Sequence, residues 1–343
     1  MENKIVVGVI GGGSIGRLHI SNIKHAIPNI ELRYVVDPFP DNYNEWASQN
    51  GYPNAISDYN VILQDPDIQG VLICSSASTH ADLTIECAKA GKHVFCEKPL
   101  DYDLEKIKDV IKIAQKHNIK VQMGYNRRFD HNFSRAHKHV LEDKVGEVRH
   151  IKITSRDPLP PPEEYFKAVG GSAGGMFLDT SIHDIDMARY MARGAEVIEI
   201  FATGSAMVNK EAVGGVDTST IVLKFDTGAM AIIDNCWQCT YGYDQRLEVF
   251  GSKGFITVDN DKESTCVLNN EYGAQAEQAL YFYNTRYIKA YRKELERFAE
   301  SILNETNVLV DEKDGYYSVL IAKACDISVK EKRIVSMEEM IKI

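Results

Sequence analysis

The stretch Ile5-Val6-Val7-Gly8-Val9-Ile10-Gly11-Gly12-Gly13-Ser14-Ile15-Gly16 decides the fold of this chain. Its first half is a short apolar run rich in Val and Ile, which is typical of a buried strand. Its second half fits G-x-G-x-x-G and leads into a helical pattern. In such a turn the glycines let a pyrophosphate approach backbone N–H groups at a helix N-terminus. We therefore predict a dinucleotide site that includes Gly11, Gly13, Ser14, Ile15 and Gly16.

Asp37 supports this interpretation because it follows the second predicted strand, about 20 residues after the last glycine. A carboxylate at that point would hydrogen-bond the adenine ribose hydroxyls and would repel the 2'-phosphate of NADP. The next residues, Pro38-Phe39-Pro40, contain no arginine that could neutralise this phosphate. The sequence therefore predicts NAD as the cofactor in preference to NADP.

The first third of the chain alternates buried strands with helices of apolar spacing three and four. Because this alternation builds right-handed βαβ units, we predict a Rossmann domain with a doubly wound parallel sheet over residues 1–124. The predicted strands are 5–10, 32–36, 71–74, 93–96 and 120–123, and the predicted helices are 14–25, 42–50, 79–90 and 103–117.

After about residue 125 the pattern changes to a run of strands with helices on either side. Turn signals such as Asp226-Thr227-Gly228 separate the strands, which favours a sheet with antiparallel neighbours. We predict a second α/β domain over residues 125–343, built on an open, mostly antiparallel sheet. Its predicted strands are 147–155, 197–206, 218–225, 229–237, 245–250, 255–258 and 265–268, with helices at 130–141, from Asp179, near 283–303 and at 313–330.

Composition excludes several classes of protein. The chain is 44% hydrophobic and 26% charged, and no apolar run approaches the roughly 20 residues that cross a bilayer. A net charge of -10 argues against a broad nucleic-acid surface. The apolar run after the N-terminus is too short for a signal peptide. We expect a cytoplasmic protein with no membrane or nucleic-acid partner.

The seven cysteines form an odd set, as expected for reduced and buried thiols. Cys236-Trp237-Gln238-Cys239 has C-x-x-C spacing, but it lies in an apolar, strand-like run. No His/Cys/Asp group has convincing metal-ligand spacing, so we predict no metal.

Asp179 and His183 form a candidate acid/base pair. They lie four residues apart at a predicted helix start after Gly174-Gly175, which would set both on one helix face near its N-terminus. A histidine exchanges a proton near neutral pH, and a neighbouring carboxylate fixes its tautomer. The alternative is that Asp179 and His183 cap the helix or are ordinary polar residues on its surface.

Glu97-Lys98-Pro99 follows the predicted strand 93–96. Ligands of open α/β sheets bind at the carboxyl ends of the strands, so Lys98 is expected to project toward the cofactor.

Together, the glycine turn, Glu97-Lys98-Pro99 and the Asp179/His183 pair resemble the Gfo/Idh/MocA oxidoreductases over nearly the whole chain. Several further blocks are similar to the inositol 2-dehydrogenases within that family: residues 124–130, 153–158, 183–189 and 241–246. The resemblance implies that Lys98, Asp179 and His183 are catalytic, with His183 as the base. It also implies cofactor contacts by Ser75, His80, Glu97 and Lys98, and a homotetramer formed through the outer sheet face.

The substrate that the resemblance implies is a cyclic polyol, with myo-inositol first and a pyranose sugar or glycoside as the alternative. Its candidate contacts are Lys98, Asn126, Arg127, Asp157, Asp179, His183, Asp186, Tyr241 and Tyr243. Three features depart from the inositol pattern: Leu178 stands where an arginine is frequent, Cys236-Trp237-Gln238-Cys239 lacks the usual basic residue, and the glycine-rich stretch 170–175 is long. A non-catalytic NAD-binding regulator is a further alternative.

Overall fold

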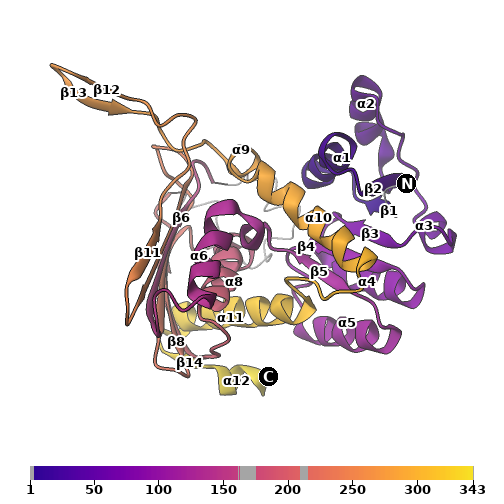
Figure 1. Ribbon diagram of the computed structural model, residues 1–343. Coiled ribbons are helices and arrows are strands. Elements are labelled where there is room, and N and C mark those ends of the chain that lie inside the picture. Colours follow the sequence, from indigo (N-terminus) through magenta and orange to yellow (C-terminus); the bar gives the residue numbers. More distant parts are fainter. Residues whose placement is uncertain (1–3, 161, 163–174, 209–214, 343) are drawn as a thin grey trace. The chain divides into compact units, whose positions relative to one another are not determined.

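The computed structural model describes residues 4–160, 162, 175–208 and 215–342, which form two compact units (Figure 1). The first unit combines Met1–Phe129 with Lys289–Val319, and the second combines Asp130–Ile288 with Leu320–Ile343. The sequence predicts one division after residue 124. In the structure the chain instead returns to the first unit at Lys289 and leaves it again after Val319.

The first unit is built on a five-stranded parallel sheet in the order β2-β1-β3-β4-β5. This confirms the predicted Rossmann sheet. The prediction succeeds because strands that are buried on both faces appear in the sequence as continuous apolar runs with sharp ends. The structure adds a short helix, α3, that the apolar spacing did not predict. The bounds are β1 Ile5–Ile10, α1 Ser14–Ala26, β2 Ile30–Val36, α2 Pro40–Asn50, α3 Asn60–Gln64, β3 Gly70–Ile73, η1 Ala77–Thr79, α4 His80–Lys89, β4 His93–Glu97, α5 Leu104–His117, β5 Val121–Gly124 and η2 Asn126–Phe129.

A helix from late in the chain completes the core of the first unit. α10 (Ile288–Leu303) buries Leu295 and Phe298 in one apolar cluster with Val7 and Phe95 of the sheet. The predicted helix near 283–303 is in fact two helices: the shorter α9 (Tyr283–Arg286) ends at Arg286, and α10 begins at Ile288 after the single residue Tyr287.

The second unit contains a seven-stranded sheet in the order β11-β10-β6-β9-β8-β7-β14. All neighbouring strands in it are antiparallel except β6 and β9, which pair in parallel, so the predicted mostly antiparallel sheet is confirmed. The bounds are α6 His131–Leu141, β6 Val148–Arg156, η3 Phe177–Ser181, α8 Ile182–Met191, β7 Val197–Ser205, β8 Thr218–Phe225, β9 Met230–Cys236, β10 Asp244–Gly251, β11 Phe255–Val258, β12 Val267–Asn270, β13 Gly273–Ala276, β14 Val335–Ser336 and α12 Met337–Ile341. Helix α11 (Glu312–Glu331) begins in the first unit and continues into the second after Val319.

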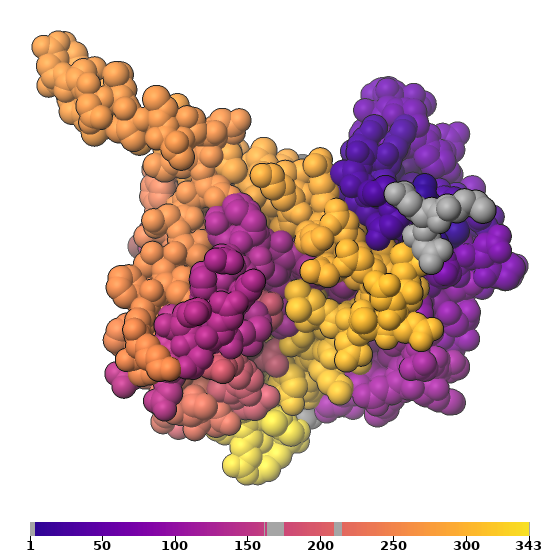
Figure 2. Space-filling model, viewed as in Figure 1, coloured from indigo at the N-terminus to yellow at the C-terminus, as the bar shows by residue number. Residues whose placement is uncertain are grey.

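Buried and exposed side chains alternate along the central strands of this sheet, as the period of a strand requires. Helix α8 packs against β6 and β9 and so covers one face (Figure 1). β12 and β13 form a separate two-stranded hairpin whose residues are all exposed, and Figure 2 shows it reaching away from the sheet of its own unit.

No helix in the described part of the chain is long and apolar enough to cross a membrane. All seven cysteines are free thiols, as predicted. The expectation that they are buried is wrong for Cys266, which is exposed beside the hairpin, and Cys236 is half-buried.

Candidate active site

The glycine turn between β1 and α1 is shaped to receive a phosphate group. Gly11 has φ +106°, and a Cβ added to it would lie 2.5 Å from the Cys74 carbonyl carbon, so a side chain cannot replace its hydrogen. Gly13, in contrast, faces open space: among the described residues no atom lies within 4 Å of an added Cβ. It precedes the first turn of α1, which has no acidic residue and no side-chain cap. The N–H groups of that turn are therefore available to an anion.

Asp37 directly follows β2 and is anchored beside the same turn. Its Oδ2 accepts a 2.7 Å hydrogen bond from the Gly12 N–H, and its Oδ1 accepts one of 2.9 Å from the Phe39 N–H. A carboxylate has about four lone-pair positions, so these two bonds leave acceptor capacity for ribose hydroxyls. The half-buried side chain thus lies next to the open glycine turn.

These features fit NAD. The order β2-β1-β3 reverses direction between β1 and β3, and ligands of doubly wound sheets bind at such a switch point, outside the carboxyl ends of the strands. The pyrophosphate would lie on the open turn at Gly13 and the first turn of α1, and the adenosine ribose on Asp37.

The other predicted residues of the first unit gather along the same edge of the sheet. Ser75 follows β3, and Glu97 and Lys98 lie at the end of β4. Asn126 and Arg127 follow β5 in the 3₁₀ turn η2 and are each 3% exposed. The next residue, Arg128, forms an ion pair of 2.9 Å with Asp314.

His80 begins α4 and is almost fully buried. Its Nδ1 lies 2.7 Å from the Pro99 carbonyl oxygen and its Nε2 lies 3.0 Å from the Ser75 carbonyl oxygen. Burial lowers the pKa of His80, which favours the neutral ring. A neutral imidazole has one N–H and can donate to only one of the two carbonyl oxygens, and the shorter contact favours Pro99.

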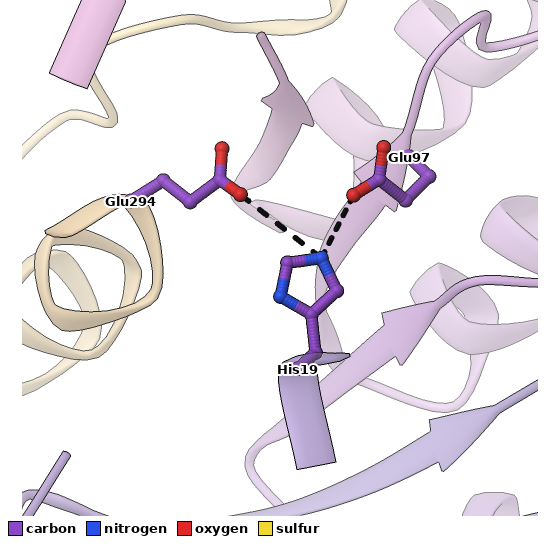
Figure 3. A group of neighbouring side chains, drawn as sticks. All are labelled: His19, Glu97 and Glu294. Atoms are coloured by element: carbon purple, nitrogen blue, oxygen red, sulfur yellow. Dashed lines mark hydrogen bonds and ion pairs between the residues drawn. The ribbon is translucent and has the colours of Figure 1, made fainter. Parts of the chain in front are cut away.

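Glu97 also turns inward, where it meets two groups distant in the sequence (Figure 3). Its Oε1 lies 2.8 Å from Nε2 of His19 in α1, and the same nitrogen lies 4.0 Å from a carboxylate oxygen of Glu294 in α10. His19 and Glu294 are fully buried. Neither carboxylate oxygen of Glu294 has a hydrogen-bond partner among the described residues. Nothing in the sequence predicts this cluster, because the apolar spacing of α10 gives no hint of a buried carboxyl group.

Glu294→Gln is expected to stabilise the protein increasingly as pH rises. Burial first, and then the charge of Glu97, raise the pKa of Glu294 well above its ordinary value of 4.5. The unfolded chain therefore releases this proton first, and wild type loses stability as the pH rises from 4.5 toward the folded pKa. Thermal unfolding of both proteins between pH 5 and 8 measures the difference.

Glu300→Gln, on the same helix but partly exposed, is the control, and its difference from wild type should stay nearly constant with pH. A constant difference for Glu294→Gln as well would contradict a proton on Glu294.

The second unit carries Asp179 and His183 at a change of helix type. Asp179 lies inside η3, a single π-helical stretch, and His183 lies in the first turn of α8. The predicted helix start at Asp179 is wrong, because the chain is already helical at Gly175 and Met176. Both side chains are partly exposed, whereas Leu178 is 5% exposed. Stretches of π-helix occur frequently at functional sites. The glycines before 175 lie outside the described residues.

Buried hydrogen bonds tie this helical segment to the sheet. Asn235 of β9 donates to Asp184 Oδ2 at 2.9 Å, and its own oxygen accepts from the Ser181 hydroxyl at 2.6 Å. The Trp237 indole donates to the Thr180 hydroxyl at 2.7 Å. These contacts hold the helical segment between Asp179 and His183 and at the residue directly after His183. The signal that could have revealed Asn235 is its place after Ala231 and Ile233 on the buried face of β9.

The remaining candidates differ in their surroundings. Asp157 follows β6 and is partly exposed, and Asp186 is 1% exposed within α8. Tyr241 donates its hydroxyl hydrogen to Asp244 at 2.7 Å and accepts from Arg156 at 3.0 Å. Tyr243 is buried, with its ring edge-on to Phe282 and Tyr287. The contacts of the two tyrosines are those of a polar network and of ordinary packing.

Comparison with known proteins agrees with this geometry. The description "Oxidoreductase family, NAD-binding Rossmann fold" matches residues 5–125, and "GFO/IDH/MocA C-terminal domain" matches residues 133–257. The chain is 43% identical to a myo-inositol 2-dehydrogenase of Thermotoga maritima over 98% of its own length and 99% of the relative. It is 30% identical to a scyllo-inositol 2-dehydrogenase (NAD(+)) of Bacillus subtilis, with 98% of each chain covered.

A solved structure shows the same fold with ligands. It is scyllo-inositol dehydrogenase from Lactobacillus casei with bound cofactor NAD(H) and scyllo-inositol, which is 28% identical, with a TM-score of 0.89 and coverage of 97% of this chain and 99% of that one. The chain studied here therefore belongs to the Gfo/Idh/MocA family of oxidoreductases and is an NAD-dependent dehydrogenase.

Proposed function

We propose that this dehydrogenase oxidises one secondary hydroxyl of a cyclic polyol, and that its substrate is myo-inositol, oxidised at C2 to 2-keto-myo-inositol (scyllo-inosose). The observation that carries the proposal is the 43% identity to a myo-inositol 2-dehydrogenase over nearly the full length of both chains. The second candidate is another inositol isomer or a pyranose sugar. Leu178 is buried at the position where an arginine is frequent in the inositol pattern, and this difference supports the second candidate substrate.

In the proposed reaction the protein handles the proton, and NAD, when bound, accepts the hydride at C4 of its nicotinamide. His183 removes the proton of the reacting hydroxyl. Asp179 orients the imidazole and favours its protonated form. Lys98 hydrogen-bonds the same oxygen and stabilises the negative charge that develops on it.

The other ring hydroxyls need polar partners, and discrimination between polyols depends on which buried groups would be left without one. We propose Asn126, Arg127, Asp157 and Asp186 for this role. Asn126, Arg127 and Asp186 are buried polar residues within the sequence blocks that resemble the inositol 2-dehydrogenases. Tyr241 and Tyr243 are weaker candidates, since the contacts described above account for their positions. The proposal also keeps the homotetramer that the family resemblance implies and the cytoplasmic location that the composition predicts.

A substrate panel tests the proposal. Purified protein is offered myo-, scyllo- and chiro-inositol, glucose, galactose and simple glycosides, each with NAD and then NADP, and NADH or NADPH absorbance is followed. Myo-inositol with NAD should give the highest kcat/KM. Reduction with a sugar but with no inositol would overturn the substrate assignment, and NAD binding without turnover of any member would favour the non-catalytic regulator.

Asp37→Asn is expected to shift cofactor preference toward NADP. The amide oxygen can still accept the Gly12 N–H, whereas the charge that repels a 2'-phosphate is lost. The ratio of kcat/KM for NADP to that for NAD should rise by at least about tenfold, which corresponds to about 1.4 kcal/mol. Asp41→Asn, on the exposed first turn of α2, is the control. Wild type that already prefers NADP would contradict this role of Asp37.

A further inference from the structure

Lys98 lies between two residues that buried histidines hold. The preceding residue, Glu97, has its carboxylate oxygen 2.8 Å from His19 Nε2. The following residue, Pro99, has its carbonyl oxygen 2.7 Å from His80 Nδ1. Both imidazoles are at most 1% exposed. His19 belongs to α1 and His80 to α4, so two separate helices contact the residues on either side of Lys98, one through the Glu97 side chain and one through the Pro99 carbonyl.

The His19 contact is a hydrogen bond from the imidazole to a carboxylate. A carboxylate can only accept, so Nε2 carries the hydrogen. Nδ1 is buried without a hydrogen-bond partner among the described residues, and a bare lone pair there costs less than a bare N–H donor. Binding of a metal through Nε2 would place an N–H at Nδ1, where metal-bound imidazoles normally have an acceptor. The geometry of His19, Glu97 and Glu294 therefore favours a hydrogen-bonded cluster over a metal site.

The carboxylate of Glu97, which contacts His19, also contacts the backbone of Lys98. Its second oxygen, Oε2, lies 3.4 Å from the Lys98 N–H nitrogen. The opposite side is closed by Gly124 of β5, where an added Cβ would lie only 2.8 Å from Oε2. The carboxylate of Glu97 thus lies between the His19 ring, the main chain of Lys98 and Gly124, whose lack of a side chain leaves space for it. Burial and the charge of Glu97 raise the pKa of Glu294, which disfavours a second negative charge in this space.

We propose that His19 and His80 are positioning residues, which fix the main chain on both sides of Lys98 and so aim its ammonium at the reacting hydroxyl. This inference rests on the proposed function, in which Lys98 stabilises the developing charge. A lysine side chain is long and flexible, so its reach depends on a fixed backbone origin. A displacement of about 1 Å at a reacting group can cost about 10²-fold in rate.

The test compares His19→Leu, which fills the site but cannot donate, with His19→Gln, which can donate to Glu97 again. His19→Leu and His80→Leu should each lower kcat about 10- to 100-fold, with the Kd of NADH changed less than about threefold. His19→Gln should restore most of the rate. The control is His93→Leu, at the other end of the same strand, where the ring accepts the Lys120 N–H at 3.0 Å. It should lower stability without lowering kcat.

Two further measurements separate positioning from general destabilisation. In a Lys98→Met background, His19→Leu should lower kcat no further, because interacting residues are not additive. Hydrogen exchange of the peptide spanning residues 94–104 should accelerate in His19→Leu and His80→Leu, and not in His93→Leu. An equal additional loss in the Lys98→Met background, or unchanged exchange, would overturn the inference. If wild type oxidises no polyol or sugar, the proposed function fails, while the exchange measurement still decides whether the two histidines hold this segment.

Discussion

His183→Ala is expected to lower kcat about 10²- to 10⁴-fold, the usual contribution of a positioned general base. Without the imidazole no group is assigned to take the hydroxyl proton as the hydride leaves. Binding of NAD should be unchanged, because the glycine turn and Asp37 lie in the first unit and His183 lies in the second. Single-turnover reduction of NAD measures the chemical step, and NADH fluorescence measures the Kd of the reduced cofactor.

His183→Asn sharpens this test, because asparagine keeps hydrogen-bonding groups but cannot take up a proton near neutral pH. It should be about as slow as His183→Ala. His139→Ala, on α6 of the same unit and partly exposed, controls for the loss of a histidine and should retain wild-type kcat. If His183→Asn kept most of the wild-type rate, His183 would be a hydrogen-bonding residue and not the base.

The sequence predicts the first unit closely because its local signals and its tertiary structure agree. β1 begins and ends where the apolar run 5–10 does, and the glycines that end it adopt the turn that their spacing indicates. In a parallel sheet a buried strand reads as one apolar run, and each helix shows its buried face through its period. The edge that carries Lys98 follows from topology alone, since parallel strands end on the same side.

Other features depend on contacts that no local pattern encodes. The period of α10 predicts a buried face but does not identify the sheet that covers Leu295 and Phe298. The π-helical stretch around Asp179 shifts backbone hydrogen bonds without changing the apolar spacing of the sequence. β13, with the sequence Gly-Ala-Gln-Ala, has no apolar alternation and is exposed throughout, so nothing predicts it as the partner of β12.

The cluster around Glu97 is the clearest case of this kind. The family resemblance predicts Glu97 as a cofactor contact, and in the structure Glu97 ends β4 at the carboxyl edge of the sheet. Its side chain nevertheless turns inward to His19, which a sequence separation of 78 residues cannot reveal. We therefore assign its carboxylate to holding Lys98, and a contact of Glu97 with the cofactor would use the main chain.

Lys98→Met is expected to lower kcat about 10²- to 10³-fold while leaving the Kd of NADH within about threefold of wild type. Methionine has nearly the length of lysine without the ammonium, so the loss reports the charge and its hydrogen bond, and not an altered volume. Since the charge on the hydroxyl oxygen develops during the reaction, the loss should appear mainly in kcat and less in the KM of the polyol.

Lys98→Arg separates charge from position. Arginine restores the positive charge, but its planar guanidinium is larger than the compact ammonium of lysine and presents its donors in a fixed fork. Because the backbone of residue 98 is held on both sides, the main chain cannot shift to accommodate the guanidinium. Lys98→Arg should therefore recover only a minor part of the lost rate. Lys89→Met, on an exposed part of α4, should leave kcat unchanged. Full recovery by Lys98→Arg would mean that any positive charge near the hydroxyl suffices. In that case the rate would depend neither on the exact position of the Lys98 ammonium nor on His19 and His80.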